Sequence, residues 1–503
     1  MSSVTLTTAV LVSLVRSIIV ALLALGVVSV QERWIASSRS RTTRQIRTAM
    51  AIVPFFIPEL LIGFHYRLTA TQWTAELGGV AGAMATELLY GVLQIGRASA
   101  VGLCVGLLLP RSSVTPESLY SWRLLKGRID SGRWWRGWLK LHLAGPWKSR
   151  IVCWSLMTLV SFQEFETAAL MQIDRYPIAW TVWLFDAHAA RQPLSDSLRM
   201  VVGPVLLEML ILLPAVLLIG LHGTRGSTER TETMADSERV AKGGAWTNVA
   251  TVLAAMFFGL FVVWPVVSFG AESLQGIWFL GSSPTLGWQA LRSILASGLF
   301  AAMASVAALN VCELLMTGQK FSRVLTGVLL IPGLGGSLLL SLSLLAMFQW
   351  PVFRMLYDTW LPMVLGQTLS VLPRAFAMVL LLRQWRNEES IHSAELLLAS
   401  PVPSVRQTGA GLLWRMRTFR RVLAALVLAH WCYWDITVIS NLKPIDPEPV
   451  VSRLYNEMHF ARTESLLGLT ALSLFVPVLL WVAALFVSRI SAWGLSAGEK
   501  KTS

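Results

Sequence analysis

Long apolar segments recur along the whole chain and alternate with short polar stretches, most of which are basic. Each apolar segment is about 20 residues long, the length of helix that crosses the ~30 Å hydrocarbon layer of a bilayer. Lipid offers the backbone no hydrogen-bond partners, so these segments are expected to be helices. The pattern predicts an all-α polytopic membrane protein with about 11 transmembrane helices. Their expected positions are 9–30, 50–66, 84–109, 150–172, 197–221, 247–270, 288–312, 324–348, 361–382, 422–441 and 465–488.

One stretch, residues 223–246, interrupts this alternation. It is rich in Gly, Ser, Thr and charged residues, which is typical of a solvated cytoplasmic linker. It separates a first unit, 12–222, from a second unit, 287–488, and each unit contains five predicted spans. The segment 247–270 is an extra linking span, which lets the second unit start on the same side of the membrane as the first.

The two predicted units also resemble each other in sequence. Short matches recur in the same order at a separation of about 270 to 277 residues, across five spans, which indicates internal duplication. They pair Arg16 with Arg292, Pro58 with Pro332, Arg97 with Arg374, and Glu166 with Asp435.

Charge gives the orientation. The net charge is +14, and the segments that alternate on one side of the membrane hold 30 of the 42 Lys and Arg residues, against 7 in the opposite loops. Basic loops stay in the cytoplasm. We therefore expect an inner (plasma) membrane protein with its N-terminus outside and its C-terminus inside.

The same basic character could indicate nucleic-acid binding, but membrane topology explains it more simply, and no nucleic acid is expected as a partner. The four cysteines all lie in apolar runs, without metal-ligand spacing, and are interpreted as small core residues. We therefore expect no metal site, no disulfide framework and no cofactor.

A polar loop follows the third span of each unit and carries a further pattern. In the second unit, His392-Ser393-Ala394 is followed by Leu397-Leu398 and then by several arginines before the next span. This order resembles the cytoplasmic coupling loop of ABC importer permeases, which reads Glu-Ala-Ala, three residues, Gly and a basic run. His392-Ser393-Ala394 stands at the Glu-Ala-Ala and Leu398 at the Gly. In the first unit Tyr120-Ser121-Trp122 lies opposite this motif, and Gly127 belongs to the same loop.

Five spans per unit, with a long basic inner loop after the third, is also the layout of the type I, binding-protein-dependent permeases. Two such units in one chain are similar to the ferric-iron and thiamine permeases. The resemblance covers roughly 12–222 and 287–488. It implies a transport subunit, not an enzyme, that works with ABC ATPase subunits, expected as a dimer on the cytoplasmic face, and with an extracytoplasmic solute-binding protein. The chain lacks the Gly-x-x-x-x-Gly-Lys-Ser/Thr motif, so ATP hydrolysis is expected in a partner.

Ionisable residues inside spans are candidates for the solute path, because they are costly in lipid and usually face the bundle interior. The candidates are Glu164, Glu166, Asp435, Arg97 and Arg374. We hypothesise that Glu166 and Asp435, at matching places in the two units, attract a cation. The competing interpretation for each residue is an interhelical hydrogen bond.

Two other functions fit parts of the pattern. Repeat symmetry also occurs in secondary transporters that work alone. A divergent membrane scaffold that has lost transport would explain the missing Glu and Gly of the loop motif. The loop helices themselves could instead rest on the lipid interface, with Trp134, Trp135 and Trp138 as anchors. Dependence of uptake on ATP separates these alternatives.

Overall fold

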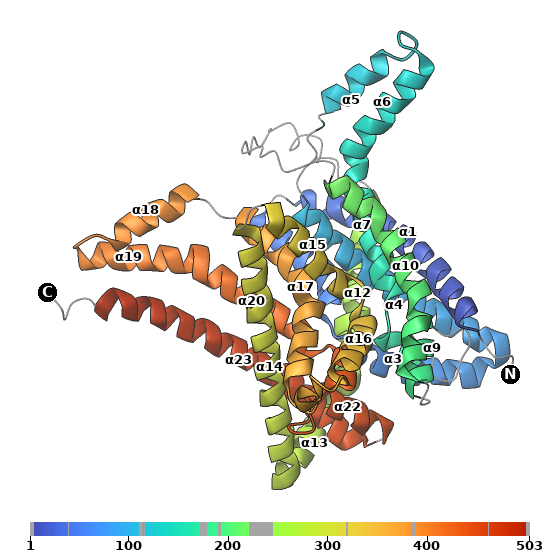
Figure 1. The fold of residues 1–503 in the computed structure, drawn as a ribbon, viewed down its shortest axis with the longest axis vertical. Helices are drawn as coiled ribbons and strands as arrows, with labels where there is room; N and C mark the ends of the chain where they lie inside the picture. Colours follow the sequence, from blue (N-terminus) through green and yellow to red (C-terminus); the bar gives the residue numbers. More distant parts are fainter. Residues whose placement is uncertain are drawn as a thin grey trace. The chain divides into compact units, whose positions relative to one another are not determined.

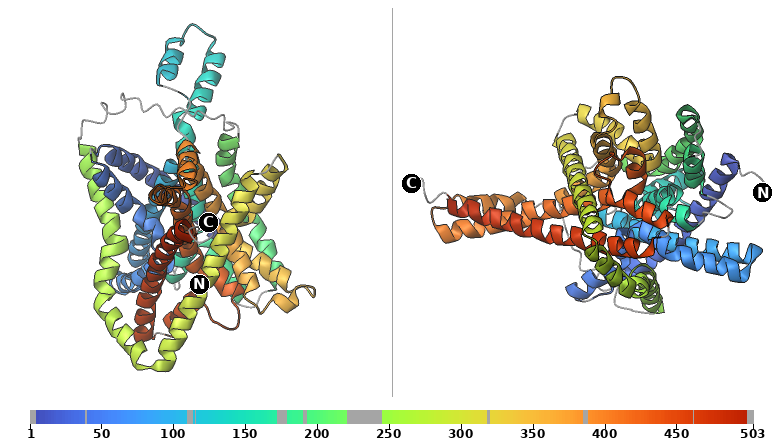
Figure 2. Two further views of the ribbon diagram at one scale, coloured as in Figure 1. Left: turned by 90° about the vertical axis from the view of Figure 1, so that its left-hand side faces the viewer. Right: turned by 90° about the horizontal axis from the view of Figure 1, so that it is seen from below.

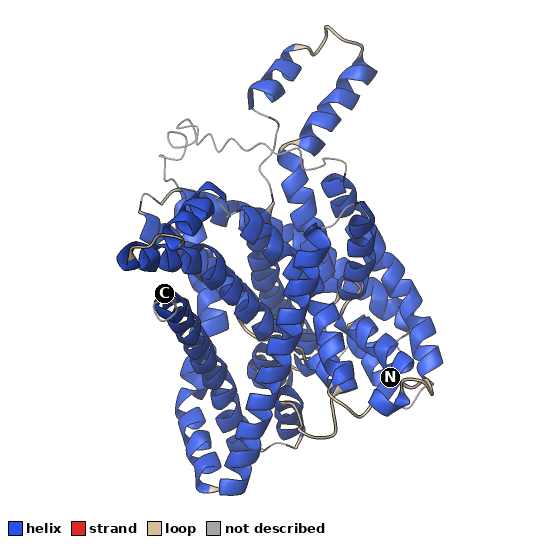
Figure 3. Cartoon of the chain, turned by 60° about the vertical axis from the view of Figure 1, so that its left-hand side comes forward, coloured by secondary structure: helices blue, strands red, loops and turns tan. Residues whose placement is uncertain are grey.

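The computed structural model describes residues 5–38, 40–109, 114, 116–171, 179–189, 193–220, 245–317, 320–384, 388–460 and 462–498. The regular elements within these ranges are helices, and no strand occurs among them (Figure 3). The helices form two compact units, Met1–Val267 and Ser268–Ser503. Most of the predicted linker, up to residue 244, lies outside the described residues.

The first unit contains the extra segment as well as the five predicted spans. Its helix α12 packs against α1 and α2, and a π-helical turn, Gly259–Val263, leads from it into α13, which runs across the unit boundary. The helices are α1 (Leu6–Ala36), α2 (Arg41–Phe56), α3 (Glu59–Leu77), α4 (Gly79–Leu108), α5 (Pro116–Leu124), α6 (Ser131–Ala144), α7 (Pro146–Phe162), α8 (Glu166–Met171), α9 (Trp180–Ala189), α10 (Leu194–Gly220), α12 (Ala245–Phe258) and α13 (Trp264–Ser282).

The second unit follows with the same order of long and short helices. They are α14 (Pro284–Thr317), α15 (Lys320–Leu334), α16 (Ser337–Phe348), α17 (Leu361–Gln384), α18 (Glu388–Leu398), α19 (Pro403–Leu413), α20 (Phe419–Tyr433), α21 (Ile436–Leu442), α22 (Val450–His459) and α23 (Thr463–Gly498). A 3₁₀ turn, Arg354–Leu356, lies between α16 and α17, and a π-helical turn, Trp414–Thr418, joins α19 to α20.

Contacts within the two units follow one scheme (Figure 1). Helix α1 packs against α4 and α7, as α14 packs against α17 and α20. The short α8 packs against α3 and α4, as α21 packs against α16 and α17. Helix α10 packs against α7 and α9, as α23 packs against α20 and α22. Within the described residues, each unit therefore repeats the same arrangement of ten helices, from α1 to α10 and from α14 to α23, with α5–α6 matched by α18–α19.

The described residues include six helices long and apolar enough to cross a membrane, or up to nine if each of three bent pairs forms one span. These helices support the membrane class. The count of 11 is not confirmed, because α7 has only 17 residues and the apolar part of α23 is similarly short.

Several predicted spans are broken by a sharp bend. The bend is 79° between α2 and α3, 106° between α15 and α16, and 60° between α20 and α21. At the first, Pro58 cannot donate a backbone hydrogen bond to continue the helix. At the second, Gly336 has φ of +88°, a backbone conformation that residues other than glycine rarely adopt. The expected continuous spans 50–66, 324–348 and 422–441 are therefore each two helices.

The exposed faces of the long helices are apolar, as lipid contact requires. On α10 the buried positions include Ser197, Val201 and Ala215, whereas Leu206 on the opposite face is 65% exposed. A stripe of exposed leucines and valines of this length would be a liability in water but is the ordinary surface of a membrane helix.

Small residues bring the central helices of the first unit close together. Ala21 and Ala24 of α1 lie in one buried cluster with Ala98 of α4 and Met157 of α7. A Cβ atom added at Gly102 would come within 2.9 Å of the Val28 side chain. Such close approach is how membrane helices gain packing energy without a hydrophobic driving force.

Candidate functional site

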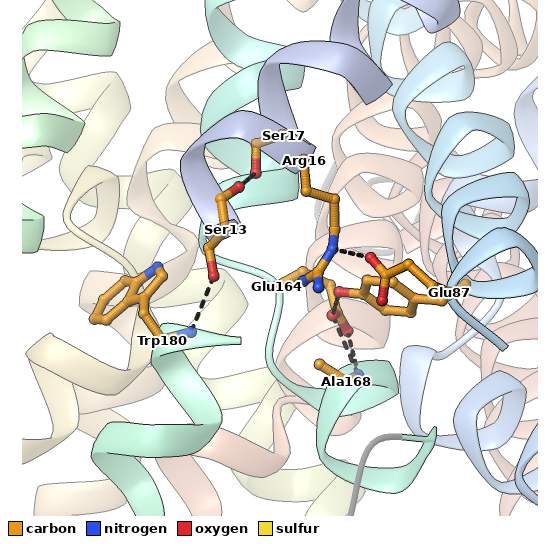
Figure 4. Close-up of polar contacts among 8 residues, drawn as sticks. Ser13, Arg16, Ser17, Glu87, Glu164, Ala168 and Trp180 are labelled. Atoms are coloured by element: carbon orange, nitrogen blue, oxygen red, sulfur yellow. Dashed lines mark hydrogen bonds and ion pairs between the residues drawn. The ribbon is translucent and has the colours of Figure 1, made fainter. Parts of the chain in front are cut away.

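A buried carboxylate occupies the break between α7 and α8 (Figure 4). Glu164 is 4% exposed, and its Oε1 atom accepts the backbone N–H of Thr167 at 2.6 Å. Its Oε2 atom accepts the N–H of Ala168 at 3.2 Å and the hydroxyl of Tyr90 on α4. Glu164 therefore caps α8 and ties it to the third span of the unit.

Tyr90 extends this cluster to α1. The guanidinium of Arg16 lies over the Tyr90 ring, 5.1 Å from its centroid, and Arg16 Nε donates to Glu87 Oε1 at 2.5 Å. On α1, one turn before Arg16, Ser13 Oγ accepts the backbone N–H of Trp180 at 3.0 Å, at the start of α9 (Figure 4). These contacts join α1, α4, α8 and α9 around one polar centre inside an apolar bundle.

The second unit has an equivalent acid-capped break, formed by different residues. Asp435 Oδ1 accepts the N–H of Val438 at 3.1 Å and so caps α21. Its Oδ2 accepts the hydroxyls of Ser370 on α17 at 3.0 Å and of Ser337 on α16 at 3.2 Å. In both units an acid caps the short helix after the break and takes a hydroxyl hydrogen bond from the third span.

This geometry corrects the sequence pairing of Glu166 with Asp435. The residue that does in the first unit what Asp435 does in the second is Glu164. Glu166 instead accepts the N–H of Leu60 at 3.1 Å, at the start of α3. Sequence alignment by offset alone could not separate two acids that lie two positions apart.

The predicted arginines lie near the breaks as well. Arg97 pairs with Glu59, the first residue of α3. Both line a small cavity, together with Gln94 and Thr167, with about the room that one water molecule needs. Arg374, at the matching place in the second unit, lies over the Trp431 ring at 5.2 Å from its centroid. In the first unit, Glu164, Glu166 and Arg97 thus gather around one pair of helix breaks.

The predicted coupling residues of the first unit lie on a helical hairpin, α5–α6, that extends beyond α7 (Figure 2). Trp122 and Trp134 hold it closed, because each indole N–H donates to the backbone carbonyl of the other residue at 3.2 Å. Gly127, in the turn, has φ of +85°. Tyr120 and Ser121 are exposed, so they are available to a partner.

The residues of the second loop lie on the corresponding hairpin, α18–α19. Ala394 is fully buried, and a Cβ atom at Gly409 on α19 would come within 2.9 Å of the Ala394 carbonyl oxygen. Ala394 therefore holds the two helices together and does not reach a partner, which corrects its predicted contact role. His392 and Ser393 are exposed, and so is Leu398, whereas Leu397 is partly buried.

Sequence reasoning left out several residues of these sites. The polar cluster also contains Tyr90, Arg16 and Glu87. Polar side chains within apolar spans were the sequence signal that could have identified them. Leu396, 61% exposed, is the most exposed large apolar residue on α18. The amphipathic period of α18 could have identified it, because Ile391 and Ala394 define the buried face.

No three or more His, Cys, Asp or Glu side chains within the described ranges form a group that could hold a metal ion. Compared with family models, curated proteins and solved structures, the chain matches none of them.

Replacing Glu164 with alanine is expected to lower the free energy of unfolding by about 2 to 3 kcal/mol, because a helix cap and a buried hydrogen bond are lost together. Glu164→Gln should cost less, since one acceptor oxygen remains. Thermal unfolding of the purified protein in detergent measures both. Glu76→Ala, at an exposed position of α3, is the control; equal melting temperatures for Glu164→Ala and Glu76→Ala would contradict the capping role.

Proposed function

We propose that this chain is the transmembrane permease subunit of an ATP-driven ABC importer and forms the path of a solute across the inner membrane. The observation that carries the proposal is the pair of hairpins. Each unit has one hairpin after its third long helix, and each hairpin leads into a helix that ends at an acid-capped break. Two duplicated permease units in one chain would produce this arrangement.

The hairpins are connected to the spans in a way that suits transmission of force. Helix α19 continues through its π-helical turn into α20 without a bend that divides it, over Pro403–Tyr433. Only Gly145 lies between the end of α6 and the start of α7. A displacement of either hairpin therefore moves the helix whose far end carries Glu164 or Asp435. Coupling of this kind requires a rigid element with two arrangements.

In this proposal the partners are ABC ATPase subunits at the hairpins and a solute-binding protein at the opposite face. Helices α19 and α23 lie side by side in the second unit (Figure 2), so the α18–α19 hairpin is supported along one side and exposed on the other. Exposed apolar and polar side chains on a supported hairpin favour docking of a protein.

We propose a solute of the ferric-iron or thiamine type, on the basis of the fused layout. Glu166 and Asp435 are kept as candidates for attracting a cation, although they do not stand at equivalent places, because Glu164 is the counterpart of Asp435. Both already accept hydrogen bonds inside their own units, which also supports a structural role. Uptake of each solute therefore has to be measured directly.

The orientation gives a separate prediction. A single cysteine at Ser121, on α5, should be protected from an impermeant thiol reagent in intact cells, because the hairpin is expected inside. A cysteine at Met355, in the exposed turn between α16 and α17, should be labelled. Of the native cysteines, three are buried and Cys104 is partly buried, which keeps the background low. The reverse labelling pattern would overturn the orientation.

Purification from native membranes in mild detergent tests the proposal. We expect an ATPase chain to elute with the protein and ATP hydrolysis to accompany it. Elution without any ATPase, together with uptake that follows a proton gradient, would support a secondary transporter with repeat symmetry.

A further inference from the structure

The two hairpins carry opposite charge although they occupy the same place in the two units. Residues 116–144, which form α5–α6, contain six Lys and Arg residues and two acids. Residues 388–413, which form α18–α19, contain three acids and one Arg, and the next basic residues, Arg415 and Arg417, lie in the π-helical turn that follows. Duplicated elements that served identical partners would be expected to keep the same sign of charge.

The charges that differ are displayed to solvent. Arg133, Arg136 and Lys140 are exposed and recur at spacings of three and four, which places them on one side of α6. Glu389 and Glu395 are exposed on α18. No ion pair to any of these five residues occurs among the described residues. Both sets of charge are therefore available to partners.

The surfaces also differ in shape and in apolar content. The basic hairpin is aromatic: Trp134 and Trp135 pack together with ring centroids 5.5 Å apart, and Tyr120 is exposed. The acidic hairpin has closely approaching helices, at Gly409, and exposes Leu396 and Val402. The two hairpins therefore present different side chains to a partner.

We propose that the two hairpins bind two different ATPase subunits, one with an acidic groove for α5–α6 and the other with a basic groove for α18–α19. This inference rests on the proposed function. Like charges placed against each other across an interface cost several kcal/mol, so a pair of identical subunits would disfavour one of the hairpins. An unlike pair satisfies both.

Site-specific photocrosslinking tests this in the full-length protein in native membranes. Benzoylphenylalanine is introduced at Ser121 or at Ser393, both exposed, and the crosslinked products are identified by mass spectrometry. We expect two different ATPase chains, one from each position. Met355, exposed between α16 and α17, is the control and should capture neither.

The other outcomes separate the inference from the proposed function. Capture of the same ATPase chain from both positions would overturn the inference and leave the importer proposal standing. Capture of lipid alone from both positions would overturn both and support hairpins that rest on the membrane interface. Capture of an ATPase from Ser121 and lipid from Ser393 would also overturn the inference.

Charge reversal tests the electrostatic part. Arg133→Glu combined with Arg136→Glu should lower the crosslink from Ser121 about tenfold and leave the crosslink from Ser393 unchanged. Glu389→Lys combined with Glu395→Lys should do the opposite. Both pairs lie on exposed helix faces, so loss of folding is not expected. Unchanged crosslinks in both double variants would overturn the assignment of acidic and basic grooves.

Discussion

Replacing Leu396 with aspartate is expected to abolish ATP-dependent uptake while the protein remains folded in the membrane. Leu396 is 61% exposed on α18, so the substitution disturbs no packing inside the chain. If this side chain is buried in an ATPase groove, the new carboxylate loses its water and the apolar contact together. A central interface residue contributes about 2 kcal/mol or more, which is roughly 30-fold in affinity. The two measurements are the amount of ATPase subunit that co-purifies with the variant and the rate of ATP-dependent uptake.

The matched control is Ile445→Asp. Ile445 is 79% exposed in the loop after α21, on the side expected to face away from the cytoplasm. This variant should keep its ATPase. Leu397→Asp is less informative, because Leu397 is partly buried and its replacement also disturbs the hairpin. Normal uptake by Leu396→Asp would favour hairpins that lie on lipid.

The second large effect is expected from Gly409→Ala. A Cβ atom at this position of α19 would lie 2.6 Å from the backbone nitrogen of Leu398, so α18 and α19 must move apart. Overpacking of this kind costs about 1 to 3 kcal/mol. We expect roughly tenfold slower uptake at a constant amount of folded protein, because the hairpin would present a changed surface to the ATPase. The uptake rate measures the loss of coupling, and limited proteolysis of the hairpin measures the separation of α18 from α19.

Gly411→Ala provides the comparison within the same helix. Nothing lies within 4 Å of a Cβ atom added there. Alanine should therefore stabilise the helix by roughly 0.5 to 1 kcal/mol and leave uptake unchanged. Equal uptake by the two alanine variants would show that close packing of α18 on α19 does not contribute to coupling.

The sequence predicted the membrane class and most long helices because apolar length is a direct requirement of the bilayer. The start of α5 at Pro116, with Glu117 next to it, also has a signal in the sequence. A proline at the first helical position, followed by an acid, is a local signal that does not depend on distant contacts.

The helix breaks were not predicted, because apolar composition continues through each of them. A hydropathy pattern records a residue's polarity and not its backbone angles. The break at Gly335–Gly336 had a local signal in its paired glycines, whereas the break before Asp435 had only one acid within an apolar run. Such an acid is also a helix N-cap signal, and it could have been interpreted as one.

The polar cluster around Glu164 could not be predicted from the sequence for a different reason. Arg16, Glu87 and Tyr90 come from α1 and α4, and only the packing of those helices brings them to α8. The role of Ala394 was assigned wrongly because the loop motif does not record which face of α18 is covered by α19.

Uptake by right-side-out membrane vesicles is the most direct test of the proposed function. Vesicles that contain the chain, its co-purifying ATPase and solute-binding protein are loaded with ATP, and radiolabelled ferric iron and thiamine are supplied outside. We expect accumulation of one of them that requires internal ATP and persists when a protonophore removes the proton gradient. Accumulation that is independent of ATP and stops with the protonophore would contradict an ATP-driven importer.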